Sequence, residues 1–174
     1  MTVDQLTAAL RRDSATWRIG RAWFVRAAMR AIAAGEFRVI AGRHHDAVYL
    51  ARFWLSPMLR LPDGSPDSGD SLLLHWIARD DDDGALHDHP WDFETRVVSG
   101  GYVEQQPDGG EISAHTGTTL WRQATDLHRV TQVRPDTWTL VETGPKVRTW
   151  GFVRPGGAWT PWREYLGVEA GAVQ

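Results

Sequence analysis

Two imidazoles and three carboxylates stand within eight positions between His87 and Glu94, where the chain reads His-Asp-His-Pro-Trp-Asp-Phe-Glu. This is the densest group of metal-binding and proton-transferring side chains in the sequence. If residues 85–89 are extended, His87 and His89 project from the same face of a strand, because side chains alternate with a period of two. Neutral imidazole is a common ligand of transition metals, so the pair could share one ion.

The residues around this pair predict how the chain enters and leaves it. Pro90 lacks a backbone donor and predicts a turn directly after the histidines. A second extended segment is expected over residues 93–99, ending at two consecutive glycines. The acidic residues 80–83 precede the pair and indicate a solvated turn, because their spacing lacks the later glutamate of an EF-hand loop.

The elements that must position the histidines are mostly β. Residues up to Gly35 carry apolar side chains at helical spacing, with Gly35 as the expected C-cap. From Glu36 the apolar period changes to two, and short runs are separated by Gly and Pro. This pattern predicts an antiparallel jelly-roll barrel with N-terminal α-helices. The expected strands cover residues 37–41, 47–55, 71–77, 93–99, 102–106, 111–115, 130–133, 138–142 and 147–153, with a long loop at 56–70.

The whole chain, 1–174, is expected to form one domain, with a helical appendage over 1–35 and the barrel over 36–166. Two hairpins are predicted in its second half: 102–106 with 111–115, and 130–133 with 138–142.

Composition limits the function classes. The net charge of −3 and the sequence pI near 6.1 give no general attraction to nucleic acid or to anionic membrane. The chain has no cysteine, so disulfides, thiolate metal sites and cysteine nucleophiles are excluded. Neither a signal peptide nor an apolar run long enough to span a bilayer is evident, and we expect a cytoplasmic protein that acts on a small molecule.

The spacing around the histidine pair resembles the cupin family. The first cupin motif contains a glycine, two histidines one residue apart, a glutamate and a second glycine, and the second motif adds one more histidine after a glycine-rich turn. This chain departs from the family in a shorter first spacer, and it lacks the usual Pro-x-Gly before the last histidine and the Asn after it. The matching residues are Gly84, His87, His89, Glu94 and Gly101 for the first motif, and Gly117 and His128 for the second.

The resemblance implies that His87, His89, Glu94 and His128 are metal ligands. Two alternatives stay open for the carboxylate: Asp92 takes its place, or neither binds and three histidines hold the metal. In the last case Glu94 would support a ligand or act as a general base. Such a donor set suits Fe(II), which we favour, and also Zn, Mn, Ni or Cu.

The function that the resemblance favours is a mononuclear Fe(II) oxygenase, a dioxygenase type of oxidoreductase, acting on a small polar metabolite or a modified amino acid. The alternatives are a non-redox cupin isomerase, epimerase or lyase, and a non-catalytic cupin that serves as a binding protein. The resemblance also implies a homodimer.

Three further residues are candidates for roles at the site. Arg96 lies two positions after Glu94 and could anchor an anionic substrate. Tyr102 is a candidate proton donor, although packing at a strand start is the simpler interpretation. His75 lies in an apolar run and could face the cavity, but a lone histidine there is more often packed than ligating.

Overall fold

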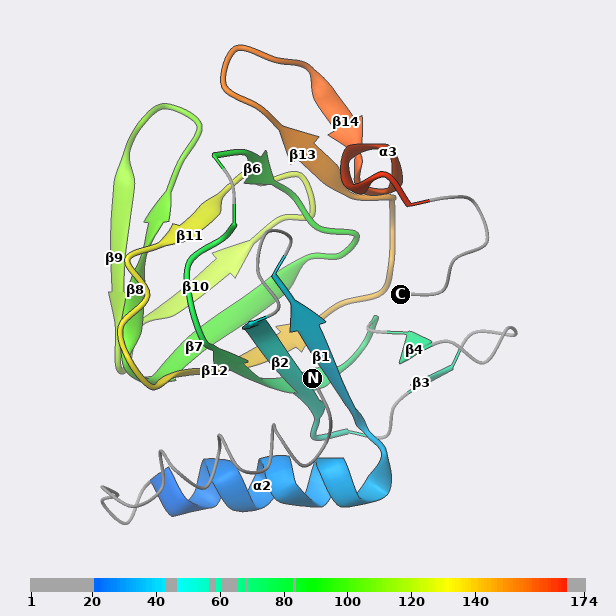
Figure 1. The fold of residues 1–174 in the computed structure, drawn as a ribbon, viewed down its shortest axis with the longest axis vertical. Coiled ribbons are helices and arrows are strands. Elements are labelled where there is room, and N and C mark those ends of the chain that lie inside the picture. The colour runs from blue at the N-terminus through cyan, green and yellow to red at the C-terminus, as the bar shows by residue number, and fades with distance from the viewer. Residues whose placement is uncertain are drawn as a thin grey trace.

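Antiparallel strands are the main secondary structure of the protein, in a computed structural model that describes residues 21–42, 47–56, 59–60, 66–67, 69–82 and 84–168. Helix α2 (Arg21–Ala34) precedes a six-stranded sheet in the order β1-β2-β5-β12-β7-β10 (Figure 1). These strands are β1 (Phe37–Ala41), β2 (Val48–Trp54), β5 (Leu72–Ile77), β12 (Thr137–Thr143), β7 (Phe93–Ser99) and β10 (Thr119–Arg122).

Three smaller sheets complete the described part of the chain. One has the order β11-β8-β9, with β11 (Arg129–Thr131), β8 (Gly101–Gln105) and β9 (Glu111–His115). Another has the order β14-β13-β6, with β14 (Trp159–Pro161), β13 (Gly151–Val153) and β6 (Leu86–His87), and the short helix α3 (Trp162–Leu166) follows it. The strands β3 (Leu59–Arg60) and β4 (Pro66–Asp67) pair within the predicted loop.

The predicted strand positions are confirmed over most of the chain, and the β8–β9 hairpin forms as expected. The second predicted hairpin is wrong. Strand β11 pairs with β8, whereas β12 pairs with β5 and β7 in the large sheet. The turn at 134–137 therefore carries the chain from one sheet to another, and Thr137 is fixed there because its Oγ1 donates to Arg134 O, at 2.8 Å.

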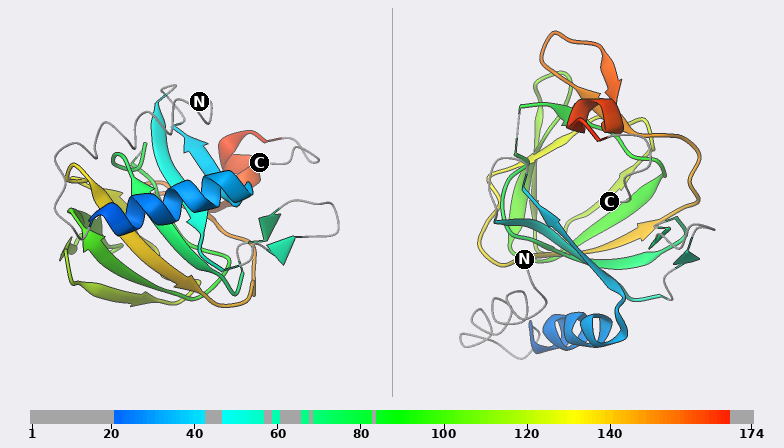
Figure 2. Two further views of the ribbon diagram at one scale, coloured as in Figure 1. Left: turned by 90° about the horizontal axis from the view of Figure 1, so that it is seen from below. Right: turned by 45° about the vertical axis from the view of Figure 1, so that its right-hand side comes forward.

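The prediction of an antiparallel β fold is confirmed, but the strands do not close into a continuous barrel. The sheets face one another around an interior (Figure 2). Between β6 and the segment before β11, pairing is reduced to one isolated bridge at His87 and His128. After this bridge, His89 N donates to Ala124 O at 3.1 Å, and no regular ladder follows.

Helix α2 covers the outer face of the large sheet (Figures 1 and 2). Ala28 and Ala31 on the helix pack against a buried cluster that contains Phe53, Leu74 and Trp138. The small alanines allow the helix to approach the aromatic rings closely, and Gly35 ends the helix with a φ of 71°, as predicted. The expected helical residues before Arg21 lie outside the described part of the chain.

Strand alternation sends the other set of side chains into the interior. Leu50, Ile77, Val97, Tyr102 and Ala114 form one apolar cluster there. A second interior cluster contains Trp54, Leu73, Trp91, Phe93 and Val141. No helix in the described part of the chain is long and apolar enough to cross a membrane.

We predict that Trp138→Ala lowers the free energy of unfolding by about 3–5 kcal/mol, because it leaves a cavity beneath α2. Trp138 is only 2% exposed and stacks near Phe24, Phe53 and Trp76. Urea denaturation followed by tryptophan fluorescence and circular dichroism would measure the change. Trp121→Ala is the matched control: Trp121 is 56% exposed, and its loss should cost less than about 1 kcal/mol. Equal effects of the two substitutions would contradict the packing described here.

Candidate metal centre

Three histidines meet inside the fold: His87 from β6, His89 just after it, and His128 just before β11. One ring nitrogen of each lies within 4.8 Å of those of the other two, and His89 Nε2 is 2.8 Å from His128 Nε2. The bridge between His87 and His128 places two of the rings, since His87 N donates to His128 O at 2.8 Å and His128 N donates to His87 O at 3.0 Å.

The separation of the His89 and His128 nitrogens is close to that of two ligands on a single transition-metal ion. Metal–nitrogen bonds of about 2.1 Å at right angles place two ligand nitrogens about 3.0 Å apart, close to the 2.8 Å between His89 and His128. The three histidines are the one group of this kind among the residues that the structure describes. The donor set is therefore three imidazoles.

Carboxylates stand behind two of the three rings. Glu104 Oε1 lies 3.2 Å from His128 Nδ1, at an angle that makes the contact electrostatic rather than a hydrogen bond. Asp81 Oδ2 lies 3.6 Å from His87 Nδ1. A carboxylate next to one imidazole nitrogen favours a proton there and turns the other nitrogen, Nε2, toward the metal.

Glu104 was missed from the sequence and is the most buried carboxylate of the site, only 2% exposed. Arg122 donates to its Oε1 from Nε at 2.8 Å and from Nη2 at 2.5 Å, and Gln106 Nε2 donates to it at 3.0 Å. Burial acts to raise the pKa of Glu104, but His128 and Arg122 outweigh it and lower that pKa to about 2. The available signal was strand alternation, which puts Glu104 on the same face as Tyr102.

The sequence predicted that the acidic turn before the histidines is solvated. In the structure, two of its carboxylates instead hold neighbouring segments in place. Asp81 Oδ2 accepts from Val130 N at 2.7 Å, and its Oδ1 accepts from the hydroxyl of Tyr49. Asp80 Oδ1 accepts from Val133 N at 2.7 Å. A β-bulge leaves Tyr49 without a partner in β1, which lets its side chain turn toward Asp81. The turn is thus tied to the segment that carries His128.

Burial holds the His87 and His89 rings in the neutral form that binds a metal. Burial lowers the pKa of His87 to about 4, although Asp81 opposes the shift. Burial, His128 and His87 lower the pKa of His89 well below 6.5, with smaller contributions from Arg52 and His75. Neutral imidazoles bind metal without first losing a proton at neutral pH.

Neither predicted carboxylate joins the three rings. Glu94 is exposed on the outer face of the large sheet, opposite Trp121 and Glu142, which are exposed too. Phe93 and Thr95 point inward instead. The glutamate of the motif is therefore one residue away from an inward-facing position, and a one-residue step reverses the face of a strand. Asp92 is also exposed, and its Oδ1 accepts from Ala124 N at 2.7 Å.

Of the two other predicted catalytic residues, one faces outward and the other is buried in the interior. Arg96 shares the outer, exposed face of β7 with Glu94, as the alternation predicted, and this directs it away from the interior. Tyr102 is 5% exposed within the apolar cluster that contains Leu50 and Ile77. Burial and Glu104 raise the pKa of Tyr102, which makes its hydroxyl a weaker acid.

Aromatic rings surround the histidines on two sides. The His89 ring lies 4.6 Å from the Phe93 ring and 5.9 Å from that of Trp91. The His87 ring lies 5.9 Å from Phe152 and 6.5 Å from Trp150. These aromatic walls reduce the access of water, which is consistent with the depressed histidine pKa values.

Asp88, between the two motif histidines, fastens the C-terminal segment to the site. It is 2% exposed, and its Oδ1 accepts from Gly151 N at 2.7 Å. Its Oδ2 accepts from Trp159 Nε1 at 2.9 Å and from Arg148 Nη1. The strand that carries Phe152 is thereby held against His87, with which it pairs in the β13–β6 ladder.

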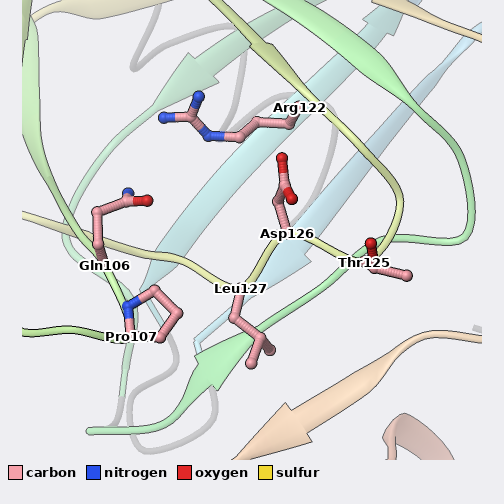
Figure 3. Close-up of a pocket in the computed structure, with 6 residues that line it drawn as sticks. All are labelled: Gln106, Pro107, Arg122, Thr125, Asp126 and Leu127. Carbon is pink, nitrogen blue, oxygen red and sulfur yellow. The ribbon is translucent and has the colours of Figure 1, made fainter.

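A surface pocket of about 340 Å³ lies beside Arg122 and Gln106 (Figure 3). Arg122 and Gln106 line it, and both donate to Glu104. None of the three histidines lines this pocket. The pocket therefore borders the residues that hold Glu104 rather than the three histidines. Its lining is Gln106, Pro107, Arg122, Thr125, Asp126 and Leu127.

No family model matches the sequence, and no curated protein matches it either. Solved structures that resemble the chain are cupin-fold proteins. KdgF from Halomonas sp. is 16% identical, with a TM-score of 0.42 over 57% of this chain and 81% of that one. Ectoine synthase from P. lautus is 13% identical, with a TM-score of 0.42 over 59% and 69%.

A third similar structure is the Streptomyces protein Pac13, described as a nucleoside dehydratase. It is 11% identical, with a TM-score of 0.47 over 69% of this chain and 87% of that one.

We predict that Glu104→Gln weakens metal binding about 10- to 100-fold, because it removes the charge that orients the His128 ring. Competition with a chelating dye would measure the affinity. Glu94→Gln is the matched control and should leave the affinity unchanged, since Glu94 is exposed on the outer face. If Glu94→Gln weakened binding as much as Glu104→Gln, the assignment of the supporting carboxylate would be wrong.

The metal-free protein should lose stability as the pH falls from about 6.5 to about 4. In this window the unfolded chain protonates His87 at its ordinary pKa of 6.5, while the folded chain holds it neutral down to about 4. For each such proton, the free energy of unfolding falls by about 1.4 kcal/mol per pH unit. Urea denaturation at several pH values would measure the slope, which His87→Asn should reduce. An unchanged slope in this variant would show that His87 is not held neutral.

Proposed function

We propose that this chain is a metal-dependent enzyme whose mononuclear centre is held by His87, His89 and His128. The observation that supports the proposal is the convergence of three imidazoles, with ring nitrogens within 4.8 Å of one another. An all-nitrogen donor set without thiolate suits redox iron as well as Mn, Ni, Cu and Zn. Of these metals, iron(II) is the one we favour.

A bound ion would supply a Lewis-acid or redox centre with coordination positions open to substrate, water or dioxygen. With iron(II) in this site, the proposed reaction is the oxygenation of a small polar metabolite or a modified amino acid.

The chain's own residues prepare the site for that chemistry. Glu104 and Asp81 fix the orientation of His128 and His87 through the Nδ1 side of each ring. Phe93 and Phe152 stand beside the rings and limit the entry of water, which strengthens electrostatic interactions within the site. Asp88 holds Gly151 and Trp159 in place, and so keeps the second aromatic wall closed.

A second candidate function is a non-redox isomerase, epimerase or lyase. Among the described residues no carboxylate joins the three histidines. Neutral ligands leave the charge of a divalent ion undiminished, which favours polarisation of a substrate carbonyl or hydroxyl. Oxygen consumption with trial substrates separates the two candidates, because only the oxygenase requires dioxygen.

We predict that the purified protein, reconstituted anaerobically, binds about one Fe(II) per chain. The double variant His87→Ala/His128→Ala should bind none, as measured by elemental analysis after desalting. His115→Ala is the matched control, because His115 is exposed on β9, and it should bind as the wild type does. If the wild type bound none of the first-row metals, the enzyme proposal would fail and a non-catalytic binding protein would be favoured.

A further inference from the structure

Four polar side chains form a row across one face of the large sheet. Arg38 on β1 lies directly opposite Arg52 on β2. Arg52 lies opposite His75 on β5, and His75 lies opposite Thr139 on β12. Directly opposed residues of antiparallel strands share a face, so these four side chains stand side by side.

The face that carries this row is the interior one. Leu50 and Trp54 stand two positions before and after Arg52 on the same strand, and each belongs to an interior cluster. His75 likewise stands between Leu73 and Ile77, which belong to the same two clusters. The row is thus a polar belt between two apolar layers.

Two guanidinium groups in this belt need a negative partner. Like charges directly opposite one another destabilise a sheet, and burial of an unpaired charge adds to the cost. Burial and the neighbouring Arg38 lower the pKa of Arg52 to about 10, which still leaves it charged at neutral pH. Among the residues that the structure describes, no carboxylate pairs with either arginine.

The contacts of the row leave its donors available. Arg52 Nε donates to His75 Nε2 at 3.2 Å, which fixes the guanidinium plane, and neither of its Nη groups hydrogen-bonds to a described residue. His75 is neutral, because burial and Arg52 hold its pKa well below 6.5. Thr139 is 1% exposed, and its buried hydroxyl lacks a hydrogen-bond partner among the described residues.

The belt also lies next to the metal centre. The Phe93 ring is 4.6 Å from the His89 ring, and Phe93 packs in the same interior cluster as Trp54 and Leu73. Arg52 lies two positions before Trp54 on β2, and His75 lies two positions after Leu73 on β5. An anion held by the belt would therefore present the rest of its molecule toward the three histidines.

We propose that Arg52, supported by Arg38 and His75, binds an oxyanion group of the substrate, a carboxylate or a phosphate. The proposal rests on the proposed function and narrows its substrate class to small anionic molecules. A guanidinium fork matches both oxyanions through two parallel hydrogen bonds. Arg52 takes the role of anchor that the sequence had assigned to Arg96, which faces outward.

Isothermal titration calorimetry of the metal-loaded protein with malonate and with inorganic phosphate tests the proposal. At least one of the two should bind at about one per chain, and the better probe distinguishes a carboxylate from a phosphate substrate. Arg52→Gln should weaken binding about tenfold or more, since it removes charge-assisted hydrogen bonds. Arg96→Gln is the matched control and should bind as the wild type does.

Two further variants separate this proposal from the metal proposal. If the row is the site, Arg52→Lys and Arg38→Gln should each weaken anion binding. These two variants replace Arg52→Gln if circular dichroism shows that Arg52→Gln does not fold. The metal-free variant His87→Ala/His128→Ala should retain anion binding. Absence of binding to the wild type, or equal binding by wild type and the Arg52 variants, overturns the anion site. If the wild type binds no metal but binds the anion in a way that depends on Arg52, only the proposed function is overturned.

Discussion

The reciprocal backbone hydrogen bonds between His87 and His128 are the contact on which the site depends. They join two segments that are far apart in sequence and belong to different sheets, at a place where no longer ladder forms. Because each residue both donates and accepts, the register at this point is fixed, and so is the face from which each ring projects. The neighbouring polar contacts serve the same end, since Asp81 ties its turn to Val130, two residues after His128.

The interior charge is arranged in two separate parts. On the side of the β8 strand, Glu104 is compensated by Arg122 and faces His128, so negative charge lies behind a ligand. On the side of the large sheet, Arg38 and Arg52 lie directly opposite each other and bring positive charge to the interior face. Neutral histidines between them avoid the cost of burying further charge, which accounts for the depressed pKa of His87 and His89.

The segment between the two motif histidines has a structural task of its own. Asp88 projects away from the metal side and gathers the C-terminal strands through Gly151, Trp159 and Arg148. In a strand-like His-x-His sequence the middle residue must face the opposite way from the histidines. The same alternation that pairs the rings therefore also supplies the anchor for the aromatic wall around His87, in which Trp150 stacks on Trp162 at 5.8 Å.

The sequence by itself determined most of the strand positions and the pairing of His87 with His89, because alternation and His-x-His spacing are local properties that a strand preserves. His128 was expected from the resemblance to the second cupin motif, and the structure brings it to the other two histidines. The sequence also determined that Glu94 and Arg96 share a face. Only the tertiary structure decided which face that is: it is the outer one, since Phe93 and Thr95 fill the interior. The surroundings of Glu104 and Arg52 were decided in the same way, because they depend on which strands become neighbours. Strand β11, for example, leaves its expected hairpin partner and pairs with β8, the strand that carries Glu104. Pairing between distant strands is a property of the packed chain, and no local pattern specifies it.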